Sequence, residues 1–336
     1  MTLLEKLTTA IGLPGLEDEV RDLIKAELEG IATVREDRMG NLIAVKNPDA
    51  QGPHIALSAH MDEVGLCVRH INGDGSIKFA SWGVDSRILP SMRVLVGTKK
   101  VPGVIGTKPI HLQQGNERGS VLGIDQLSID IGCENKGAAE GHAAIGDFIA
   151  FDSKFTEFGD GKIKAKALDD RVGCAAIIEM LKMDYPGKIT GIFCVQEEIG
   201  LRGSAVTAKG LQADLLINIE GTIGADMYDV PEHEHVTTQG AGPALSLIDR
   251  ATIYPRKYLD EMVRVAEANN IPYQYRRTSS GGTDAGNYHL AGEGMPVIGV
   301  AVPCRYLHSP VSVMDKRDYE NLLLLLSSFI RKGQFV

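Results

Sequence analysis

The stretch HIALSAHMDEVG, residues 54–65, starts as an apolar run and ends in an imidazole and two carboxylates. Its first part is typical of a strand buried in a core. His60, Asp62 and Glu63 then follow almost side by side. In open α/β sheets, ligands bind at the edge where the strands have their C-terminal ends, because the loops there converge on one crevice. The stretch therefore indicates a buried strand that leads into a functional edge.

Four further predicted strands also deliver a His or a carboxylate at or just past their C-terminal ends. They are KIKAKAL with Asp169 and Asp170, KITGIFCVQ with Glu197 and Glu198, DLLINI with Glu220, and PVIGVAVP with His308 in the loop that follows. Because these ends are expected at one edge of a sheet, we expect residues that are far apart in the chain to meet in one site.

Taken singly, each of these residues has an ordinary structural explanation. A His after a strand is usually structural, Asp169 and Asp170 could begin a helix, and Glu197 and Glu198 could form a solvated turn. Several uncompensated carboxylates at one buried edge would, however, repel one another and lose their hydration. A divalent cation, or a pair of them, removes that cost. The joint pattern therefore favours a metal site.

The side chains in this set are nitrogen and oxygen ligands of the kind that bind catalytic zinc, cobalt or manganese. Two metals about 3.5–4 Å apart need a bridging carboxylate, and each also needs a His and a second carboxylate. The predicted metal ligands are His60, Asp169, Glu198, Glu220 and His308. This leaves Glu197 as an acid/base and Asp62 to orient His60. The pattern predicts a hydrolase and leaves the identity of the metal open.

Composition excludes several other classes of protein. With 336 residues, 43% of them hydrophobic, the chain can bury a sizeable core. A net charge of −9 argues against nucleic acid or an anionic membrane as a partner. The sequence lacks the roughly 18 consecutive apolar residues of a membrane span, and its start lacks the features of a signal peptide. The five scattered cysteines, without CxxC spacing, favour free thiols in a reducing, cytoplasmic setting.

The pattern of predicted strands, helices and turns divides the chain into two domains. Residues 1–66 and 164–336 alternate strand and helix patterns, which predicts an α/β sandwich of helices around a mostly parallel sheet. Residues 67–163 instead hold short β-rich pieces separated by Gly, Pro, Asn and Asp, with little helical periodicity. This segment is predicted to be a small, all-β, barrel-like domain inserted into the first.

Five motifs, in order along the chain, resemble the M42 family of metallo-aminopeptidases, the glutamyl and deblocking aminopeptidase group. They are SAHMDEVG, ALDDRVGC, VQEEIGLRGS, SSGGTDAG and RYLHSPVSV. The resemblance runs from about residue 3 to residue 332. It implies a zinc-exopeptidase-like catalytic domain, and it identifies the inserted segment with the β-rich dimerisation domain of the family. Members of this family have also been labelled endoglucanases.

The resemblance also implies two divalent ions per subunit, usually Zn²⁺ or Co²⁺, and a role for each site residue. His60 and Glu220 would bind one metal, Glu198 and His308 the other, with Asp169 bridging the two, Glu197 as general base and Asp62 behind His60. Asp170 would then begin the helix or lie behind the ligands. Many members carry Asp where this chain has Glu220, whose longer side chain could change the spacing of the metals or the metal preference.

The reaction expected from these residues is the release of N-terminal residues from peptides. A water activated at the metals, with Glu197 as base, would attack the first peptide carbonyl, and the free α-amino group of the substrate would bind the other metal. Gly282, Thr283 and Asp284 are expected to line the substrate pocket, because adjacent glycines allow close approach of the backbone. Three arginines are near enough in sequence to be considered for binding an acidic side chain of the substrate, although the simpler interpretation of each is an ordinary surface or structural residue: Arg276, Arg277 and Arg305.

Two other functions compete with this one. A metal-independent, endoglucanase-type glycosidase would use two carboxylates, but it leaves His60 and His308 unexplained. A non-catalytic metal-binding assembly protein leaves the spare Glu197 beside a ligand unexplained. The resemblance further implies a homo-oligomer in which dimers form through the inserted domain. Six such dimers would build a tetrahedral dodecamer that admits peptides, the alternative being a simple dimer.

Overall fold

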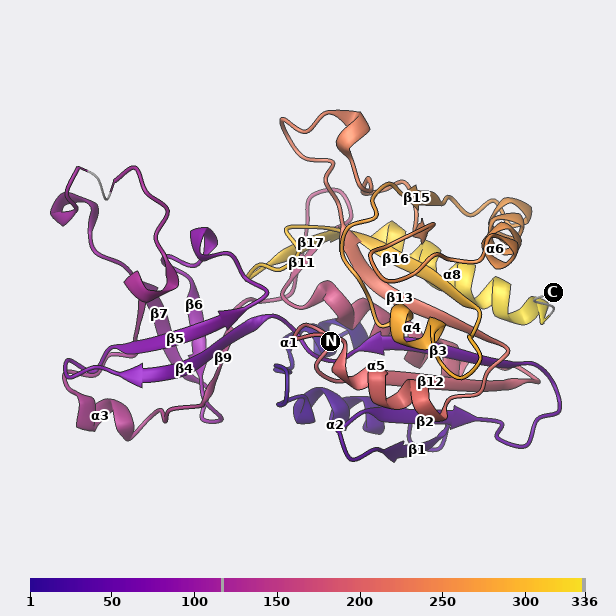
Figure 1. Cartoon of the computed structure of the whole chain (residues 1–336), viewed down its shortest axis with the longest axis horizontal. Helices are drawn as coiled ribbons and strands as arrows, with labels where there is room; N and C mark the ends of the chain where they lie inside the picture. The colour runs from indigo at the N-terminus through magenta and orange to yellow at the C-terminus, as the bar shows by residue number, and fades with distance from the viewer. Residues whose placement is uncertain (116–117, 334–336) are drawn as a thin grey trace. The chain divides into compact units, whose positions relative to one another are not determined.

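The computed structural model describes residues 1–115 and 118–333, which form two compact units (Figure 1). The first unit comprises Met1–Glu63, Phe155–Leu307 and Ser312–Val336. The second comprises Val64–Lys154 and His308–Val311. The sequence pattern had put the inserted segment at 67–163. It starts earlier because its first strand begins at Gly65, and it ends earlier because the strands after Lys154 pair within the first unit.

The first unit is built on an eleven-stranded sheet in the order β1-β2-β12-β3-β13-β16-β17-β11-β10, with β14 paired to β16 and β15 to β14. In that order the strands are β1 (Thr33–Glu36), β2 (Leu42–Lys46), β12 (Lys188–Cys194), β3 (His54–His60), β13 (Leu215–Ile223), β16 (Val297–Arg305), β17 (Ser312–Asp315), β11 (Lys162–Ala165), β10 (Thr156–Phe158), β14 (Ala244–Ser246) and β15 (Gln274–Arg276).

The predicted parallel arrangement holds for the centre of this sheet. Strands β12, β3, β13 and β16 are parallel to one another, whereas β1, β2, β17, β11 and β10 add antiparallel pairs at the two flanks. The flanks differ because some of their strands are joined by short turns, as β10 and β11 are, and a short turn can only connect antiparallel strands. The sheet is therefore mixed, with a parallel core.

Helices cover both faces of the sheet, as predicted. The α-helices of the first unit are α1 (Leu3–Thr9), α2 (Asp18–Glu27), α4 (Leu168–Lys182), α5 (Arg202–Thr207), α6 (Arg256–Ala268), α7 (Ala285–His289) and α8 (Lys316–Lys332). Helix α4 contacts β3 and β13, while α5 contacts β12 and α7 contacts β16. Because side chains alternate along a strand, Leu57 of β3 enters the core that includes α4, and Ala56 enters the core that includes Tyr288 of α7.

The second unit is the predicted small β domain, a closed barrel of β4-β5-β8-β7-β6-β9. These strands are β4 (Gly65–Ile71), β5 (Ile77–Trp82), β8 (Ser128–Asp130), β7 (Val101–Gly106), β6 (Arg93–Val96) and β9 (Phe148–Phe151), and the α-helix α3 (Lys136–Glu140) belongs to the same unit. Aliphatic and aromatic side chains fill the barrel, among them Ile77, Phe79 and Ile129. Short 3₁₀ helices occur in this unit at Ser86–Ile88, Ile110–Leu112 and Ile124–Gln126. The first unit has others at Ala208–Gly210 and Glu232–Glu234. In the described parts of the chain, no helix has the length and apolar character needed to cross a membrane.

Candidate metal centre

The parallel register brings three of the predicted strand ends to the same level. His60, the last residue of β3, pairs with Cys194, the last residue of β12. Strand β13 continues to Ile223, but its pairing with β3 ends at Asn218, so Glu220 lies just beyond the paired part. The segment after β12 and the end of β13 therefore both face the space next to His60.

The charged side chains gather around one nitrogen of this imidazole. His60 Nε2 lies 3.4 Å from Asp169 Oδ1, 3.5 Å from Glu220 Oε2 and 4.0 Å from Glu197 Oε2. The His60 side chain is only 2% exposed, and those of Asp169, Glu197 and Glu220 are 10–15% exposed. Carboxylates from three separate chain segments thus converge on one buried imidazole.

The other nitrogen of the ring is held by Asp62. His60 Nδ1 lies 3.1 Å from the backbone carbonyl of Asp62 and 3.6 Å from its carboxylate. When Nδ1–H donates to that carbonyl, the lone pair of Nε2 points towards the carboxylates, which is the form in which imidazole binds a metal. The ring therefore lies beside both the backbone oxygen and the carboxylate of Asp62, and the orienting role of Asp62 stays a prediction.

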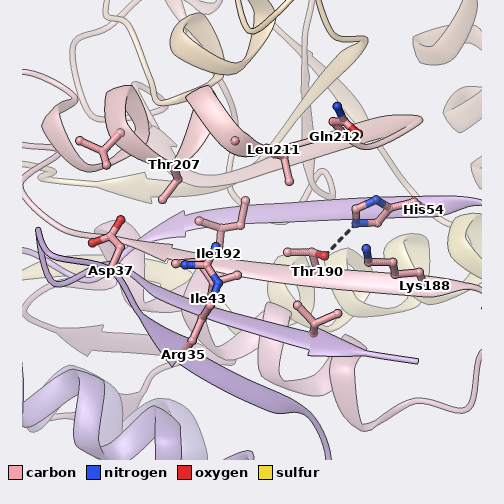
Figure 2. A pocket seen from close by; sticks show the side chains of 13 residues that line it. Arg35, Asp37, Ile43, His54, Lys188, Thr190, Ile192, Thr207, Leu211 and Gln212 are labelled. Atoms are coloured by element: carbon pink, nitrogen blue, oxygen red, sulfur yellow. Dashed lines mark hydrogen bonds between the residues drawn. The ribbon is translucent and has the colours of Figure 1, made fainter. Parts of the chain in front are cut away.

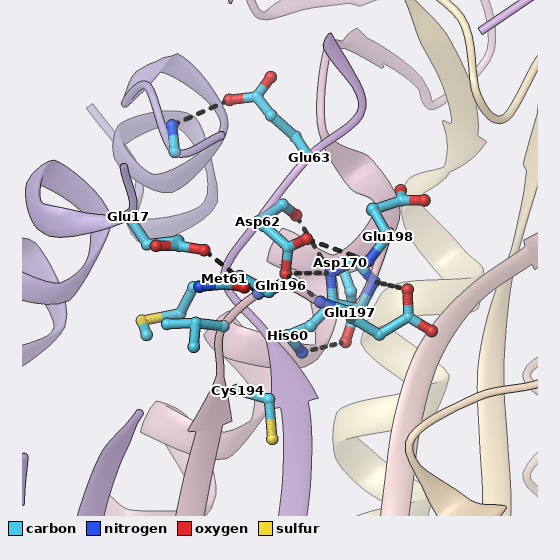
Figure 3. A network of polar contacts seen from close by, with 12 residues as sticks. Glu17, His60, Met61, Asp62, Glu63, Asp170, Cys194, Gln196, Glu197 and Glu198 are labelled. Carbon is cyan, nitrogen blue, oxygen red and sulfur yellow. Dashed lines mark hydrogen bonds and ion pairs between the residues drawn. The ribbon is translucent and has the colours of Figure 1, made fainter. Parts of the chain in front are cut away.

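The carboxylate of Asp62 has a second set of contacts that the sequence did not reveal. Its two oxygens accept hydrogen bonds from the backbone N–H groups of Glu197, at 2.9 Å, and Glu198, at 3.0 Å (Figure 3). Asp62 is fully buried. One residue therefore holds both the imidazole and the two glutamates in place.

Two groups of side chains in the first unit offer ligand atoms that all lie within 4.8 Å of one another. They are His60, Asp170 and Glu220, and His60, Asp169 and Glu198. Four of the five predicted metal ligands therefore come together, with Asp169, Glu198 and Glu220 around His60. The fifth, His308, follows β16 in the segment His308–Val311 that groups with the barrel unit, so it stays a prediction.

Asp170 directly precedes the regular part of α4 and is fully buried. Its Oδ1 accepts a hydrogen bond from Gly173 N–H at 3.0 Å, and its Oδ2 accepts one from His60 N–H at 3.2 Å. The first contact is the helix-start role that the resemblance implied. The second ties the start of α4 to the end of β3, so Asp170 supports the position of His60.

The electrostatics of the cluster fit a divalent cation. Burial, together with the charges of neighbouring carboxylates, raises the pKa of Glu198 to about 8 and holds the pKa values of Glu197, Glu220 and Asp170 well above their usual range. Burial alone would lower the pKa of His60, but the surrounding carboxylates outweigh it and raise that pKa. A cation among these groups would offset the repulsion that keeps protons on them.

Asn218 is a further member of the site that sequence reasoning missed. Its side-chain amide donates to Glu220 Oε1 at 3.0 Å, which leaves Oε2 to face His60. Asn218 is buried on the same face of β13 as Glu220, two residues earlier. The two-residue spacing along a strand was the available signal.

The loop predicted to line the substrate pocket is divided between surface and interior. Gly282 is exposed and Thr283 partly exposed, and Thr283 lines a cavity of about 40 Å³ beside Glu220. Asp284 is buried, and its Oδ1 accepts a hydrogen bond from the hydroxyl of Ser204. The direct substrate contact proposed from the sequence therefore suits Gly282 and Thr283 better than Asp284.

The three arginines considered for an acidic substrate side chain all have partners within the protein. Arg305 forms a two-point ion pair with Asp226. Arg277 donates to the carbonyl of Glu232 at 3.4 Å. Arg276 donates to the Thr222 hydroxyl and to two carbonyls of its own loop, and it lines the cavity beside Glu220. Arg276 is the one of the three that reaches the site.

A larger groove of about 380 Å³ lies over β1, β2 and β12 (Figure 2). Its floor includes Ile43 and Ile192, and His54 Nε2 lies 2.8 Å from the Thr190 hydroxyl at one end. Its carboxylate, Asp37, accepts hydrogen bonds from backbone N–H groups of its own turn. The groove therefore has a mainly structural lining, and the concentration of chemically active groups lies at the ends of the parallel strands.

Comparison with known sequences gives one consistent result. The family model described as M42 glutamyl aminopeptidase matches residues 40–325. A putative aminopeptidase of Acetivibrio thermocellus is 36% identical, and the match covers 96% of each chain. The putative aminopeptidase FrvX of Escherichia coli (strain K12) is 33% identical, over 98% of this chain and 94% of the relative.

Solved structures agree with the sequence matches. The chain is similar to aminopeptidase APDkam598 of the archaeon Desulfurococcus kamchatkensis, with a TM-score of 0.93, 34% identity and coverage of 98% of this chain and 94% of that chain. The TET1 peptidase of Pyrococcus horikoshii, described as assembling into a tetrahedron or a large octahedral shell, matches with a TM-score of 0.86, 30% identity and 98% coverage of both chains. A Thermotoga maritima protein described as an endoglucanase matches with a TM-score of 0.81 and 33% identity, over 98% of this chain and 97% of that chain.

Proposed function

The chain belongs to the M42 family of aminopeptidases, hydrolases that act on peptide bonds, and from this premise we propose that it is a dinuclear metallo-aminopeptidase. It would release N-terminal residues from peptides that carry a free α-amino group. The observation that supports this most is the convergence of Asp169, Glu197 and Glu220 on Nε2 of the buried His60, at 3.4–4.0 Å. Such a set of donors suits divalent cations such as Zn²⁺ or Co²⁺.

The residues proposed to hold the two ions are His60, Asp169, Glu198, Glu220 and His308. When bound, the ions would polarise the scissile carbonyl and lower the pKa of the attacking water. Asn218 would fix which oxygen of Glu220 turns towards His60, since its amide donates to the other one. This hydrogen bond also restrains the extra methylene that Glu220 has in comparison with the Asp of many family members.

Glu197 is proposed as the general base and acid. Its carboxylate would take a proton from the attacking water and deliver that proton to the amine of the leaving peptide. Its side chain is 11% exposed, so it can meet a substrate while remaining shielded from bulk water. Asp62 would keep Glu197 in position by accepting its backbone N–H, and Gly282 and Thr283 would contact the substrate.

The assembly is proposed to be a homo-oligomer, with dimers formed through the barrel unit and a tetrahedral dodecamer as the larger particle. The relative from Pyrococcus horikoshii, described as assembling into a tetrahedron or a large octahedral shell, supports this. Light scattering after size exclusion separates a dodecamer from a dimer. The free state of all five cysteines supports a cytoplasmic setting.

The function is tested with purified protein stripped of metal by a chelator. Hydrolysis of a panel of aminoacyl-anilides is expected to vanish after chelation and to return on addition of Zn²⁺ or Co²⁺, while an N-acetylated anilide stays uncleaved. A cellulose oligomer is assayed in parallel, because one structural relative is described as an endoglucanase. Peptide hydrolysis that persists without metal, or cleavage of the oligomer alone, would overturn the proposal.

A further inference from the structure

The chain segment that carries the two glutamates is held by side chains from three distant places. Four successive backbone N–H groups donate to side-chain oxygens: Val195 to Asn41 at 2.9 Å, Gln196 to Glu17 at 3.2 Å, Glu197 to Asp62 at 2.9 Å and Glu198 to Asp62 at 3.0 Å. We call Asn41, Glu17 and Asp62 the clamp. Turns normally satisfy such N–H groups with nearby carbonyls or with water, so four consecutive side-chain acceptors are an unusual arrangement.

The carbonyl side of the same segment is fixed as well. The carbonyls of Val195, Gln196 and Glu197 accept hydrogen bonds from backbone N–H groups at the start of α5. Gln196 has φ of +56°, in the left-handed region that side-chain-bearing residues rarely adopt. Contacts on both sides of the backbone therefore hold a conformation that the segment would not favour by itself.

The Glu17 side chain contacts Gln196 and does not cap helix α2, although it stands at the N-cap position of that helix. It precedes α2 at the N-cap position, yet its side chain makes no capping hydrogen bond to that helix. The carboxylate is 3% exposed and accepts from Gly15 N–H at 2.8 Å and from Gln196 N–H (Figure 3). A buried carboxylate that leaves its own helix uncapped and reaches a segment 179 positions away has a function at that segment.

The orientation of Asn41 is equally determined. Its side-chain nitrogen donates to Asp37 at 2.7 Å and to the carbonyl of Gly203 at 3.1 Å. The amide oxygen is thereby turned towards Val195 N–H, and the side chain is fully buried. Asn41 thus connects the start of β2 to the end of β12 and to α5.

We propose that Glu17 and Asn41 are positioning residues for the reaction: with Asp62 they fix the backbone of Val195–Glu198 so that the Glu197 carboxylate stays beside His60 before substrate arrives. This rests on the proposed role of Glu197 as base. A displacement of about 1 Å of a reacting group can cost about 100-fold in rate. Loss of one clamp residue therefore lowers kcat far more than it changes KM or metal binding.

The test compares Glu17→Met with Glu17→Gln. Met has a similar length but no oxygen, and we expect kcat to fall about 10- to 100-fold with KM within threefold and unchanged metal content. Gln keeps an acceptor oxygen, so it is expected to retain kcat within threefold of the wild-type protein. Should Glu17→Met fail to fold, Asn41→Leu is measured by the same criteria.

Asp318→Leu is the matched control. Asp318 is another fully buried carboxylate, and it accepts N–H groups from a different loop, those of Gly240 and Gly242, at 2.7 and 2.8 Å. Its replacement is expected to lower thermal stability without lowering kcat. If Asp318→Leu and Glu17→Met lower kcat equally, the effect is one of general stability and the inference is wrong.

Hydrogen exchange of the 195–201 peptide separates this inference from the proposed function. Glu17→Met is expected to speed exchange there by at least tenfold, whether or not the protein hydrolyses peptides. An inactive wild-type protein with this increase would disprove the peptidase proposal and leave the clamp intact. Unchanged exchange, or a Glu17→Met enzyme with kcat within threefold of wild type, would disprove the positioning role.

Discussion

Two buried groups of charges include residues at the end of strand β3 or just past it, and they differ in how positive and negative charges are balanced. One is the triad of Glu63, Lys166 and Arg171, and the other is the set of carboxylates around His60. In the triad, Glu63 Oε1 lies 2.6 Å from Lys166 Nζ and 3.1 Å from Arg171 Nη2, and further hydrogen bonds from these cations reach the backbone carbonyls of Ala10 and Met61. Each charged group of the triad therefore has a partner of opposite charge.

The set around His60 has no such internal balance. The charges acting on Glu220 come from Asp170, Glu197 and Asp169, which raise its pKa, and from His60, which lowers it. Carboxylates lie beside carboxylates here, an arrangement that the proposed divalent cations would stabilise. Burial of charge is therefore not itself the mark of a metal centre. The mark is burial combined with an excess of one sign.

The largest expected effect is the loss of turnover in Glu197→Gln. The amide has the same shape but cannot move the proton, so kcat is expected to fall about 10²- to 10⁴-fold. Metal content and thermal stability should stay close to those of the wild-type protein, and anilide hydrolysis with elemental analysis measures both. A variant that kept more than a tenth of the wild-type kcat would remove Glu197 from its proposed role.

The corresponding change in the triad, Glu63→Gln, is expected to act on stability and not on chemistry. It leaves two buried cations without their carboxylate, which costs about 3–5 kcal/mol in the free energy of unfolding. Urea unfolding measures this loss, while kcat at a temperature well below the transition should change less than threefold. If kcat fell as in Glu197→Gln, the two groups would not be separate in function.

Loss of a carboxylate near His60 is expected to affect the stability of the metal-free protein in the opposite direction to Glu63→Gln. Zn²⁺ at about 100 times its Kd should stabilise the protein by about 2.7 kcal/mol, seen as a higher Tm. Glu220→Gln should lose most of this increase. In chelator, however, the same variant should be at least as stable as wild type, because one repelling carboxylate is gone. A metal-free Glu220→Gln protein clearly less stable than metal-free wild type would contradict the view that this group carries uncompensated charge.

The smallest expected effect is a pH dependence that comes from Lys166. Burial, opposed in part by Glu63, lowers the pKa of Lys166 to about 8 in the folded protein, from 10.5. Between these values the unfolded chain binds the extra proton, so this residue makes stability rise with pH, by at most about 1.4 kcal/mol per pH unit. Lys166→Met should lack this contribution, which the difference between the two stability curves from pH 7 to 10 isolates. Parallel curves would show that Lys166 keeps its proton throughout.

Much of the catalytic edge could be predicted because its signals are local. Apolar runs ending in His60, Glu197 or Glu220 identify both the strands and the groups they deliver, and parallel strands bring such groups to one edge. The inserted β domain is visible in the same way, from short runs separated by turn residues. The antiparallel flanks of the sheet were not visible, because a strand's sequence does not state the direction of its neighbour.

The supporting residues could not be predicted, since their roles depend on partners that are remote in sequence. Glu17 reads as an ordinary acidic residue at a helix start, and Asn41 reads as a turn residue. Their side-chain oxygens find the N–H groups of Val195 and Gln196 only in the folded chain, where the end of β12 lies beside them. Asn218 is intermediate, because its two-residue spacing from Glu220 could have been noticed.

The clamp also has a consequence for the order in which the chain is synthesised. Glu17, Asn41 and Asp62 leave the ribosome long before Glu197, and Glu220 follows later still. An incomplete chain thus lacks the proposed base or its neighbours, so the proposed site can form only after most of the first unit has been synthesised.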